Sequence, residues 1–309
     1  MTVPPSVVSS VESVLEERAG RPVRVRRSAS VGGGCINPSA RVETEKGEAF
    51  FLKWNHSTDP EMFQAESDGL RALYAPGALR VPEVIGWGGE STSENPGWLL
   101  LEFVPRGAPV GGYGHLMGEG LARLHSSAAG TPPTSSFGWH RDNFIGSLPQ
   151  ANRTTRQWSE FWRDLRIEPQ FRLSRELGYF EGKGGEDIEI LLDRMEAILP
   201  PEAGHGPALL HGDLWSGNYF PDASGAPVLI DPAVYRGEGE VDLAMMELFG
   251  SFPAGFLDGY QGVRPIPSEY EAYRRDLYQL YYLLVHVNLF GGGYVGGSLS
   301  AVRRVLSVT

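Results

Sequence analysis

The chain has 309 residues, of which 41% are hydrophobic and 21% charged, and its formal net charge is -11. Such a composition is ordinary for a globular protein, and the length suffices for one large domain or two lobes. The net negative charge argues against a broad surface for nucleic acid or anionic lipid, but it leaves room for a local nucleotide site.

A single cysteine, Cys35, excludes a disulfide within the chain, so a reducing compartment is expected. The first residues, Met1 to Pro5, lack a basic segment followed by an apolar one, and no apolar run reaches the length of a membrane span. We therefore expect a cytoplasmic protein with neither nucleic acid nor membrane as a partner.

The first hundred residues predict one helix followed mainly by strands. Residues 6–19 have apolar side chains at helical spacing, with Ser6 as the expected N-cap and Gly20 as the C-cap. The segments with strand patterns predict a five-stranded antiparallel sheet. They are Val23–Arg26, Arg41–Thr44, Ala49–Lys53, Val81–Ile85 and Gly97–Val104.

Three consecutive glycines, Gly32, Gly33 and Gly34, lie between the first two predicted strands. Glycines let backbone amides approach a phosphate closely and tolerate positive φ angles. An ordinary hairpin loop is the alternative, and a glycine triplet alone does not decide between the two.

Lys53 in the third predicted strand has apolar neighbours, so its ammonium must reach water or find an anionic partner. Residues 59–74 predict a helix that begins at Asp59 and Pro60, and Glu66 falls on its apolar face. An ion pair between Glu66 and Lys53 would satisfy both charges and orient the lysine toward phosphate. The alternative is that Glu66 lies at the edge of this face, in water.

A composition break at Pro105-Arg106-Gly107 suits a hinge between lobes, and the pattern beyond it is mostly helical. We predict an N-terminal lobe over residues 1–103 and a C-terminal lobe over residues 104–309. Three long helices are expected in the second lobe. They span Gln157–Leu177, Glu186–Leu199 and Glu269–Phe290.

The octet His211-Gly212-Asp213-Leu214-Trp215-Ser216-Gly217-Asn218 follows a short apolar run, and Asp231 follows another. An Asp, an Asn five residues later and a further Asp at a strand end are typical of phosphotransferases with the protein-kinase architecture. There the first Asp accepts the proton of the attacking hydroxyl, and the Asn and second Asp hold Mg²⁺ with oxygen atoms. The alternative is a loop in which these side chains only cap turns.

The octet resembles the catalytic loop of the fructosamine-3-kinase, or ketosamine kinase, family, which is similar to the aminoglycoside and choline kinases. Three further stretches match that family, and together they cover nearly the whole chain. They are Gly32–Asn37, Asp231–Tyr235 with Glu240–Met245, and Leu289–Tyr294.

The resemblance implies a two-lobed, protein-kinase-like α+β fold with ATP and Mg²⁺ as cofactors. Asp213 would then orient or deprotonate the substrate hydroxyl as the catalytic residue, Lys53 with Glu66 would position the phosphates, and Asn218 with Asp231 would hold the metal. Backbone groups of the segment Glu102, Phe103 and Val104 would bind the adenine edge.

The resemblance also implies the acceptor: the 3-hydroxyl of a ketosamine, on a small molecule or on a protein. Trp215 would stack on the sugar or its amine chain, although packing between lobes explains an indole there equally well. His286 near the end of the last long helix would line the sugar pocket. Family members often have Asn before this histidine, whereas this chain has Val285.

Two other functions remain open. One is a kinase for an aminoglycoside, choline or another small alcohol; the other is a pseudokinase that binds nucleotide as a partner module. Pro232 and Ala233 follow Asp231 in place of Phe-Gly, which counts against a protein kinase with a regulated activation segment. A pseudokinase usually lacks at least one catalytic residue, so the joint presence of all five counts against it. They are Lys53, Glu66, Asp213, Asn218 and Asp231.

Cys35 adjoins the predicted phosphate loop, and this position suggests a redox role for its thiol. Nearby amides and Lys53 would lower the pKa of an exposed thiol and favour oxidation, and two chains of a homodimer would pair through it. A monomer in which Cys35 is a small buried residue is the alternative.

Overall fold

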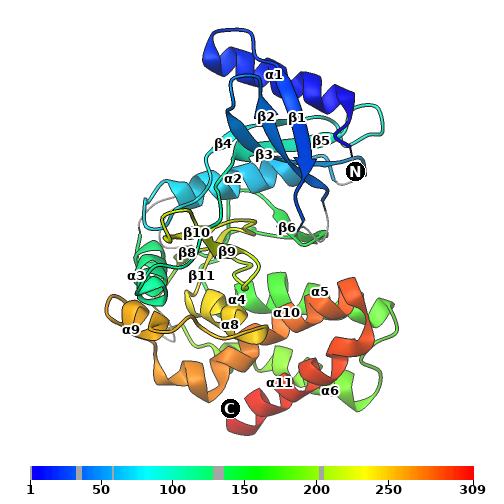
Figure 1. Cartoon of the computed structure of the whole chain (residues 1–309). Coiled ribbons are helices and arrows are strands. Elements are labelled where there is room, and N and C mark those ends of the chain that lie inside the picture. Colours follow the sequence, from blue (N-terminus) through cyan, green and yellow to red (C-terminus); the bar gives the residue numbers. More distant parts are fainter. Residues whose placement is uncertain (1, 33–36, 58, 128–135, 202–204) are drawn as a thin grey trace. The chain divides into compact units, whose positions relative to one another are not determined.

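The computed structural model describes residues 2–32, 37–57, 59–127, 136–201 and 205–309 (Figure 1). The backbone forms two compact units. The first comprises Met1–Gly111 and Tyr219–Pro232, and the second comprises Gly112–Asn218 and Ala233–Thr309. The predicted functional division into an ATP-binding lobe that ends at residue 103 and a catalytic lobe stays a prediction.

A five-stranded sheet forms the centre of the first unit, and its neighbouring strands are antiparallel throughout, as predicted. The strands follow the order β1-β2-β3-β5-β4. Their bounds are β1 Val25–Ser30, β2 Ser39–Thr44, β3 Ala49–Asn55, β4 Val84–Gly88 and β5 Gly97–Glu102. β4 begins later than the predicted Val81, because Pro82 has no N–H to donate to the sheet.

Helix α1, Pro5–Ala19, buries Val7, Val11 and Leu15 in a core that includes Trp54 and Trp98 of the sheet. Gly20 has a φ of 62°, which confirms the predicted glycine cap at the end of the helix. The predicted Ser6 cap is wrong. The helix begins at Pro5, whose fixed φ suits the first turn and whose missing N–H is not needed there.

Helix α2, Met62–Tyr74, carries Glu66 and buries Phe63, Leu70 and Leu73. It begins three residues after the predicted start at Asp59, because residues 60–61 form a turn. The carboxylate of Asp59 accepts a hydrogen bond from the Glu61 N–H at 2.9 Å and so stabilises that turn instead.

The hairpin of β9, Tyr219–Pro221, and β10, Pro227–Leu229, belongs to the first unit although it lies more than a hundred residues from the sheet in sequence. The Leu229 N–H donates to the Arg80 carbonyl at 2.9 Å. The Arg80 guanidinium contacts Asp222 at 2.5 Å and Glu102 at 2.7 Å. These bonds fix the end of β10, and with it Asp231, within the unit that contains Lys53.

The predicted hinge segment contacts the same hairpin. The Gly107 N–H donates to the Pro221 carbonyl at 2.9 Å, and the Arg106 guanidinium lies 4.3 Å from the centroid of the Phe220 ring. A Cβ on Gly107 would lie 2.3 Å from the Asp222 carbonyl oxygen, so only glycine permits this approach.

The second unit is mainly helical (Figure 1). Its helices are α3 Tyr113–His125, α4 Trp158–Trp162, α5 Glu168–Glu176, α6 Lys183–Asp193, α7 Met195–Ile198, α8 Glu240–Leu248, α9 Phe256–Gln261, α10 Arg275–Phe290 and α11 Val295–Val308. Within its described residues, strands pair antiparallel: β6 Asn143–Ile145 with β7 Leu148–Gln150, and β8 Ala208–Leu210 with β11 Tyr235–Gly237.

The three long helices predicted for this unit are interrupted or divided. π-helical turns at Arg163–Ile167 and Tyr270–Arg274 interrupt the first and third predicted helices, and the second, predicted at Glu186–Leu199, is divided into α6 and α7. Within the first π turn Arg166 is fully buried. Its guanidinium lies 4.0 Å from the centroid of the Tyr235 ring and donates to Asn152 Oδ1 at 2.6 Å.

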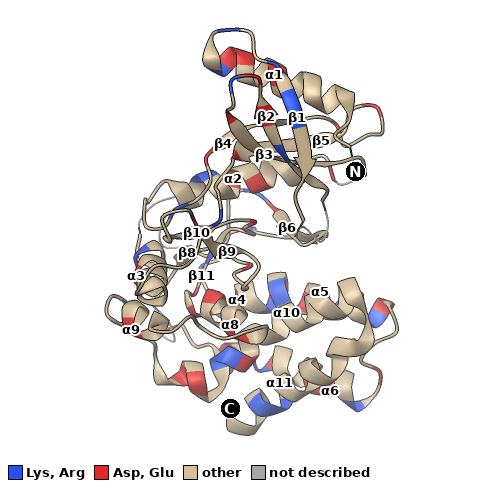
Figure 2. Ribbon diagram, in the orientation of Figure 1, with Lys and Arg blue, Asp and Glu red and all other residues tan. Residues whose placement is uncertain are grey.

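Basic and acidic residues are interspersed over the first unit, as Figure 2 shows for α1, β1 and β2. Arg27 of β1 contacts Glu43 of β2 at 2.7 Å, for example. Among the described residues, no helix is long and apolar enough to cross a membrane.

Candidate active site

Lys53, Glu66 and Asp231 form a buried charge cluster in the first unit. Lys53 Nζ contacts Glu66 Oε1 at 2.7 Å and Asp231 Oδ1 at 2.6 Å. Lys53 lies on β3 and faces Leu99 of the neighbouring strand β5, while Glu66 lies on α2. The predicted ion pair is therefore present, and Asp231 is a second partner.

Burial and charge oppose each other in this cluster. The side chains of Lys53 and Glu66 are only 9% and 12% exposed, whereas that of Asp231 is 37% exposed. Burial alone would lower the pKa of Lys53, but the carboxylates of Asp231 and Glu66 outweigh it and raise the pKa. Burial raises the pKa of Glu66, and the lysine opposes this effect. The cluster therefore holds a fixed cation beside a half-exposed carboxylate.

Asp231 has a φ of 55°, a left-handed conformation that is rare for a residue other than glycine. Such strain costs about 1 kcal/mol or more and persists only where surrounding contacts enforce it. Here the preceding residues are held by the bond from Leu229 to Arg80, and the side chain is held by Lys53.

The base of the glycine loop is closed by two hydrogen bonds between β1 and β2. The Val31 N–H donates to the Ser39 carbonyl at 3.0 Å, and the Ser39 hydroxyl donates to the Val31 carbonyl at 2.9 Å. Gly32 is exposed beside this closure. Gly33, Gly34 and Cys35 lie outside the described residues, so the phosphate-binding and redox roles of this loop stay predictions.

The end of β5 supplies the three residues predicted to bind adenine. The Glu102 N–H donates to the Glu83 carbonyl at 2.8 Å, the Phe103 ring lies 4.9 Å from the Arg41 guanidinium, and Val104 is buried. Their adenine-binding role stays a prediction.

The second unit contains the octet, and Asp242 of α8 holds the start of it. Asp242 Oδ2 accepts from the His211 N–H and Oδ1 accepts from the Gly212 N–H, each at 2.8 Å. His125 Nε2 lies 3.1 Å from Asp242 Oδ2, and its Nδ1 lies 2.8 Å from the Tyr260 hydroxyl. Burial lowers the pKa of His125, so its neutral form is favoured.

Asn218 ends the octet and folds back onto Asp213. Its side-chain N–H₂ donates to the Asp213 carbonyl at 2.8 Å and to Asp213 Oδ2 at 3.1 Å. The amide nitrogen thus orients the carboxylate of the candidate base. The amide oxygen of Asn218 is the atom with the chemistry of a Mg²⁺ ligand.

Tyr282 of α10 links that helix to the octet. Its hydroxyl donates to the Gly212 carbonyl at 2.8 Å, next to Asp213. One turn further along α10, His286 Nδ1 lies 2.7 Å from the Tyr282 carbonyl oxygen. Because a carbonyl only accepts, Nδ1 carries the proton and the Nε2 of a neutral ring is an acceptor. Burial lowers the pKa of His286, which favours that neutral ring.

Trp215 is half-buried, and its indole lies over the backbone of Gly217. A Cβ on Gly217 would lie 2.3 Å from the ring, so glycine at this position permits the stacking. The ring therefore packs within its own loop, and its contact with substrate stays a prediction.

Sequence reasoning identified most of these residues but missed Tyr282 and the second partner of Lys53. Tyr282 precedes His286 by one helical turn, and that spacing was the available signal. The contact of Asp231 with Lys53 joins residues 178 positions apart, and no local pattern encodes it.

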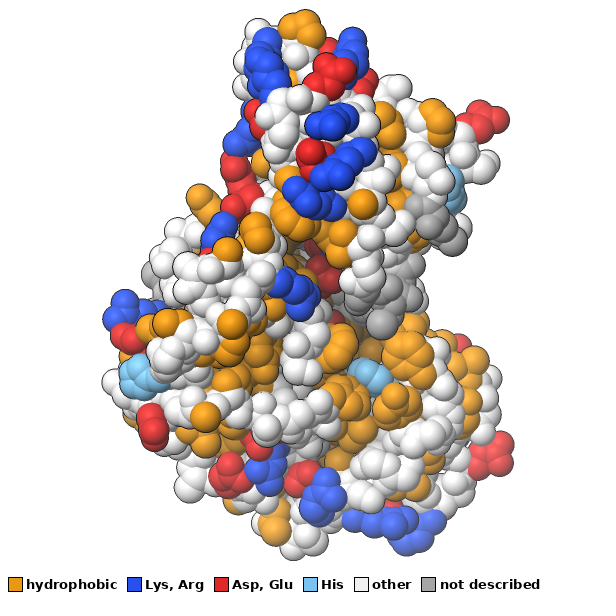
Figure 3. All heavy atoms as spheres, viewed as in Figure 1, with side chains coloured by type: hydrophobic (Ala, Val, Ile, Leu, Met, Phe, Trp, Pro, Cys, Tyr) orange, Lys and Arg blue, Asp and Glu red, His pale blue; other side chains and the backbone are white. Residues whose placement is uncertain are grey.

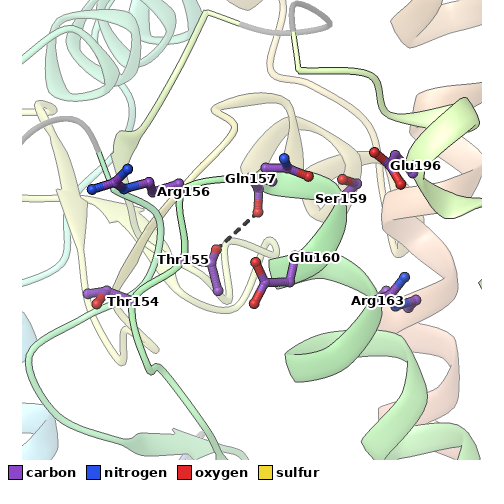
Figure 4. A pocket seen from close by; sticks show the side chains of 8 residues that line it. All are labelled: Thr154, Thr155, Arg156, Gln157, Ser159, Glu160, Arg163 and Glu196. Carbon is purple, nitrogen blue, oxygen red and sulfur yellow. Dashed lines mark hydrogen bonds between the residues drawn. The ribbon is translucent and has the colours of Figure 1, made fainter.

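The second unit also has a polar surface hollow of about 510 Å³ that is separate from these residues (Figure 4). Its lining combines polar and charged side chains from the segment around α4 with one from α7. They are Thr154, Thr155, Arg156, Gln157, Ser159, Glu160, Arg163 and Glu196. None of the predicted site residues lines it.

The fold is the two-lobed, protein-kinase-like α+β fold of small-molecule phosphotransferases. A structure of the aminoglycoside phosphotransferase APH(4)-Ia, in a ternary complex with AMP-PNP and hygromycin B, has a TM-score of 0.63. The likeness covers 97% of this chain and all of that chain at 18% identity, so it shows the fold alone.

Sequence comparison identifies the family to which the chain belongs among proteins with this fold. The family model "Fructosamine kinase" matches residues 7–308, and the chain belongs to this family of ATP-dependent kinases. A probable ketoamine kinase of Synechocystis sp. is 38% identical over 306 residues, which cover 98% of each chain. The chloroplastic protein-ribulosamine 3-kinase of Arabidopsis thaliana is 38% identical over 96% of this chain and 86% of its own length.

A solved structure from Thermobifida fusca, assigned as a fructosamine-3-kinase, has a TM-score of 0.83 at 32% identity. The match covers 97% of this chain and 99% of that one. The predicted family and fold class are thus confirmed.

Proposed function

We propose that this kinase transfers the γ-phosphoryl group of ATP to the 3-hydroxyl of ketosamines of the fructosamine and ribulosamine type. The observation that carries the proposal is the octet, in which Asp242 fixes the backbone and Asn218 orients Asp213, in a chain of the fructosamine kinase family. The names of the relatives support the choice of acceptor.

Asp213 accepts the proton of the attacking hydroxyl in this mechanism. A carboxylate whose orientation is already fixed needs little reorganisation as the proton moves. Trp215 and His286 contact the sugar: the indole stacks on a carbon face, and the unprotonated Nε2 of His286 accepts a hydrogen bond from a hydroxyl or from the amine.

Lys53 stabilises charge on the phosphates. Its pKa is raised, so the ammonium stays protonated, and Glu66 keeps it in place after a phosphate replaces Asp231 as a partner. The amides of Gly32, Gly33 and Gly34 add further donors. Phosphoryl transfer passes through a loose transition state, so positioning and charge neutralisation account for most of the catalysis.

Asn218 and Asp231 are the residues that would hold Mg²⁺. An amide oxygen and a half-exposed carboxylate are hard oxygen ligands, and two protein ligands suffice for an ion that keeps waters and phosphate oxygens. When bound, Mg²⁺ would neutralise charge that develops on the transferred phosphoryl group.

The instability of the phosphorylated product is the basis of the biological role that we propose. A ketosamine phosphorylated at the 3-hydroxyl sheds its sugar and frees the amine, so the enzyme reverses glycation of metabolites or proteins. We further propose that it acts in the cytoplasm, a location that the single cysteine of the chain supports, and that it is a monomer or homodimer.

Phosphate transfer from ATP and Mg²⁺ to a panel of ribulosamine, fructosamine, choline and an aminoglycoside tests the proposal, with Asp213→Asn as the inactive control. We expect transfer to the ketosamines that is lost in the variant. Transfer only to choline or the aminoglycoside would contradict the substrate, and ATP binding without transfer to any acceptor would favour a binding module.

A further inference from the structure

Four ring side chains gather at the end of α10 in the second unit, and we call them the aromatic cluster: Phe249, His286, Phe290 and Tyr294. His286 is at its centre. The centroid of its ring lies 4.5 Å from that of Phe249, 5.0 Å from that of Tyr294 and 5.3 Å from that of Phe290. Three separate segments therefore converge on one imidazole: the end of α8, α10 and the turn after it.

The cluster is open to solvent although it is apolar. Phe290 is 60% exposed and Phe249 is 36% exposed, and His286 and Tyr294 are half-buried. Figure 3 shows hydrophobic side chains gathered on this face of the second unit. Exposed aromatic groups of this kind commonly mark a binding surface, since a single exposed ring needs no explanation but a converging set does.

The helix that carries the cluster also contacts the catalytic loop. Tyr282, His286 and Phe290 are spaced by four residues and so follow one face of α10, and the Tyr282 hydroxyl bonds the Gly212 carbonyl at 2.8 Å. With a rise of 1.5 Å per residue, His286 lies about 6 Å and Phe290 about 12 Å along the axis from Tyr282. The cluster thus begins one helical turn from the backbone that holds Asp213.

We propose that the aromatic cluster is the subsite for the amine carrier of the ketosamine, and that it favours carriers with an unbranched carbon chain such as that of a lysine side chain. This inference rests on the proposed function. With the 3-hydroxyl at Asp213, the amine nitrogen is four bonds from the hydroxyl oxygen, a span of roughly 5 Å when extended, so the carrier begins where the cluster begins.

The chemistry of the carrier fits the rings. The ketosamine nitrogen is a secondary ammonium, which is attracted to the faces of Phe and Tyr rings, and the methylenes beyond it lose contact with water against Phe249 and Phe290. Burial lowers the pKa of His286, so the central imidazole is neutral and does not repel the ammonium.

The test compares two fructosamines that differ only in the carrier, one made from methylamine and one from n-butylamine. The quantity measured is the ratio of their kcat/KM values. We expect the wild type to prefer the butyl compound about tenfold, since each methylene that is removed from water contributes roughly a factor of four when fully buried.

Phe290→Ala should reduce this ratio to about threefold or less, and Phe249→Ala should reduce it in the same direction. Phe290→Leu keeps apolar contact area and should keep most of the preference. Leu116→Ala on α3 is the matched control, because Leu116 is also an exposed apolar residue, 43% exposed, and should leave the ratio unchanged. Phe290 is itself so exposed that its replacement should not prevent folding.

Equal kcat/KM values for the two carriers in the wild type, or a ratio that Phe290→Ala and Phe249→Ala leave unchanged, would overturn the subsite while the ketosamine kinase activity stands. Absence of turnover with either fructosamine would instead overturn the proposed function.

Discussion

The candidate residues of the first unit and those of the second are held in place by different interactions. In the first unit, ion pairs fix the side chains: Lys53 Nζ lies within 2.7 Å of the carboxylates of Glu66 and Asp231. In the second unit, one buried carboxylate, Asp242, holds backbone N–H groups of the octet and leaves Asp213 half-buried. ATP phosphates must replace Asp231 as a partner of Lys53, which an ion pair permits. The proton acceptor Asp213 must only keep its orientation, which a fixed backbone ensures.

The largest effect expected is on the proton acceptor. Asp213→Asn keeps the shape of the side chain but removes its basicity, so kcat should fall about 10³-fold while ATP affinity changes little. Steady-state rates with a ketosamine, together with nucleotide titration, measure both. A kcat within tenfold of the wild type would mean that Asp213 is not the base.

Lys53→Met tests the ionic arrangement. It leaves Glu66 and Asp231 without their shared cation, and removing one partner of a buried ion pair costs about 3 kcal/mol or more. We expect a lower free energy of unfolding in urea and a raised KM for ATP. Lys46→Met, at an exposed lysine in the turn between β2 and β3, is the matched control and should change neither.

The double variant Lys53→Met/Glu66→Gln sharpens this result. The second change removes one uncompensated buried carboxylate, so it should restore part of the lost stability but none of the ATP affinity. A double variant less stable than Lys53→Met would show that Glu66 stabilises the unit by contacts other than the lysine.

Asp242→Asn tests the backbone arrangement. Both carboxylate oxygens of Asp242 accept hydrogen bonds, whereas an amide has only one oxygen, so at least one N–H group would lose its acceptor. We therefore expect the free energy of unfolding to fall by about 2 kcal/mol and kcat to be lower. Asp258→Asn, at an exposed position on α9, is the control. Wild-type kcat in Asp242→Asn would contradict the role assigned to this carboxylate.

The smallest effect concerns Glu240, which lies two residues before Asp242. Its buried carboxylate forms an ion pair with Arg274 Nε at 3.0 Å. Burial raises the pKa of Glu240 to about 8, against the opposing effect of Arg274. A raised folded-state pKa favours folding at low pH, and this contribution is lost as the pH rises from about 4.5 through about 8.

In Glu240→Gln, the free energy of unfolding should therefore vary less with pH. The difference between its values at pH 5 and pH 8 should change by roughly 1 to 3 kcal/mol relative to the wild type. Urea unfolding at a series of pH values measures it, with Glu176→Gln at an exposed position of α5 as the control. Parallel curves for the wild type and Glu240→Gln would refute the raised pKa.

Many of the candidate site residues could be predicted from the sequence because their placement depends on local patterns. Helical periodicity placed Glu66 on a buried face, and a basic residue in an apolar strand required an anionic partner. The octet carried Asp213 and Asn218 together. These features follow from spacing and desolvation alone.

The remaining features depend on contacts between distant segments. The second partner of Lys53, the anchoring of β10 on Arg80 and the bond from Tyr282 to the octet each join parts of the chain that no periodicity relates. The start of a helix is also hard to predict: α1 begins at Pro5, before the predicted cap Ser6, because a proline at the first helical position needs no N–H partner.

The most direct test of the account measures ADP and free amine together during turnover of a fructosamine with ATP and Mg²⁺. Transfer to the 3-hydroxyl gives a product that sheds its sugar, so the account predicts amine release that follows ADP formation and approaches one equivalent. ADP formation with a stable phosphorylated ketosamine and no released amine would contradict it, because the phosphate would then be on another hydroxyl.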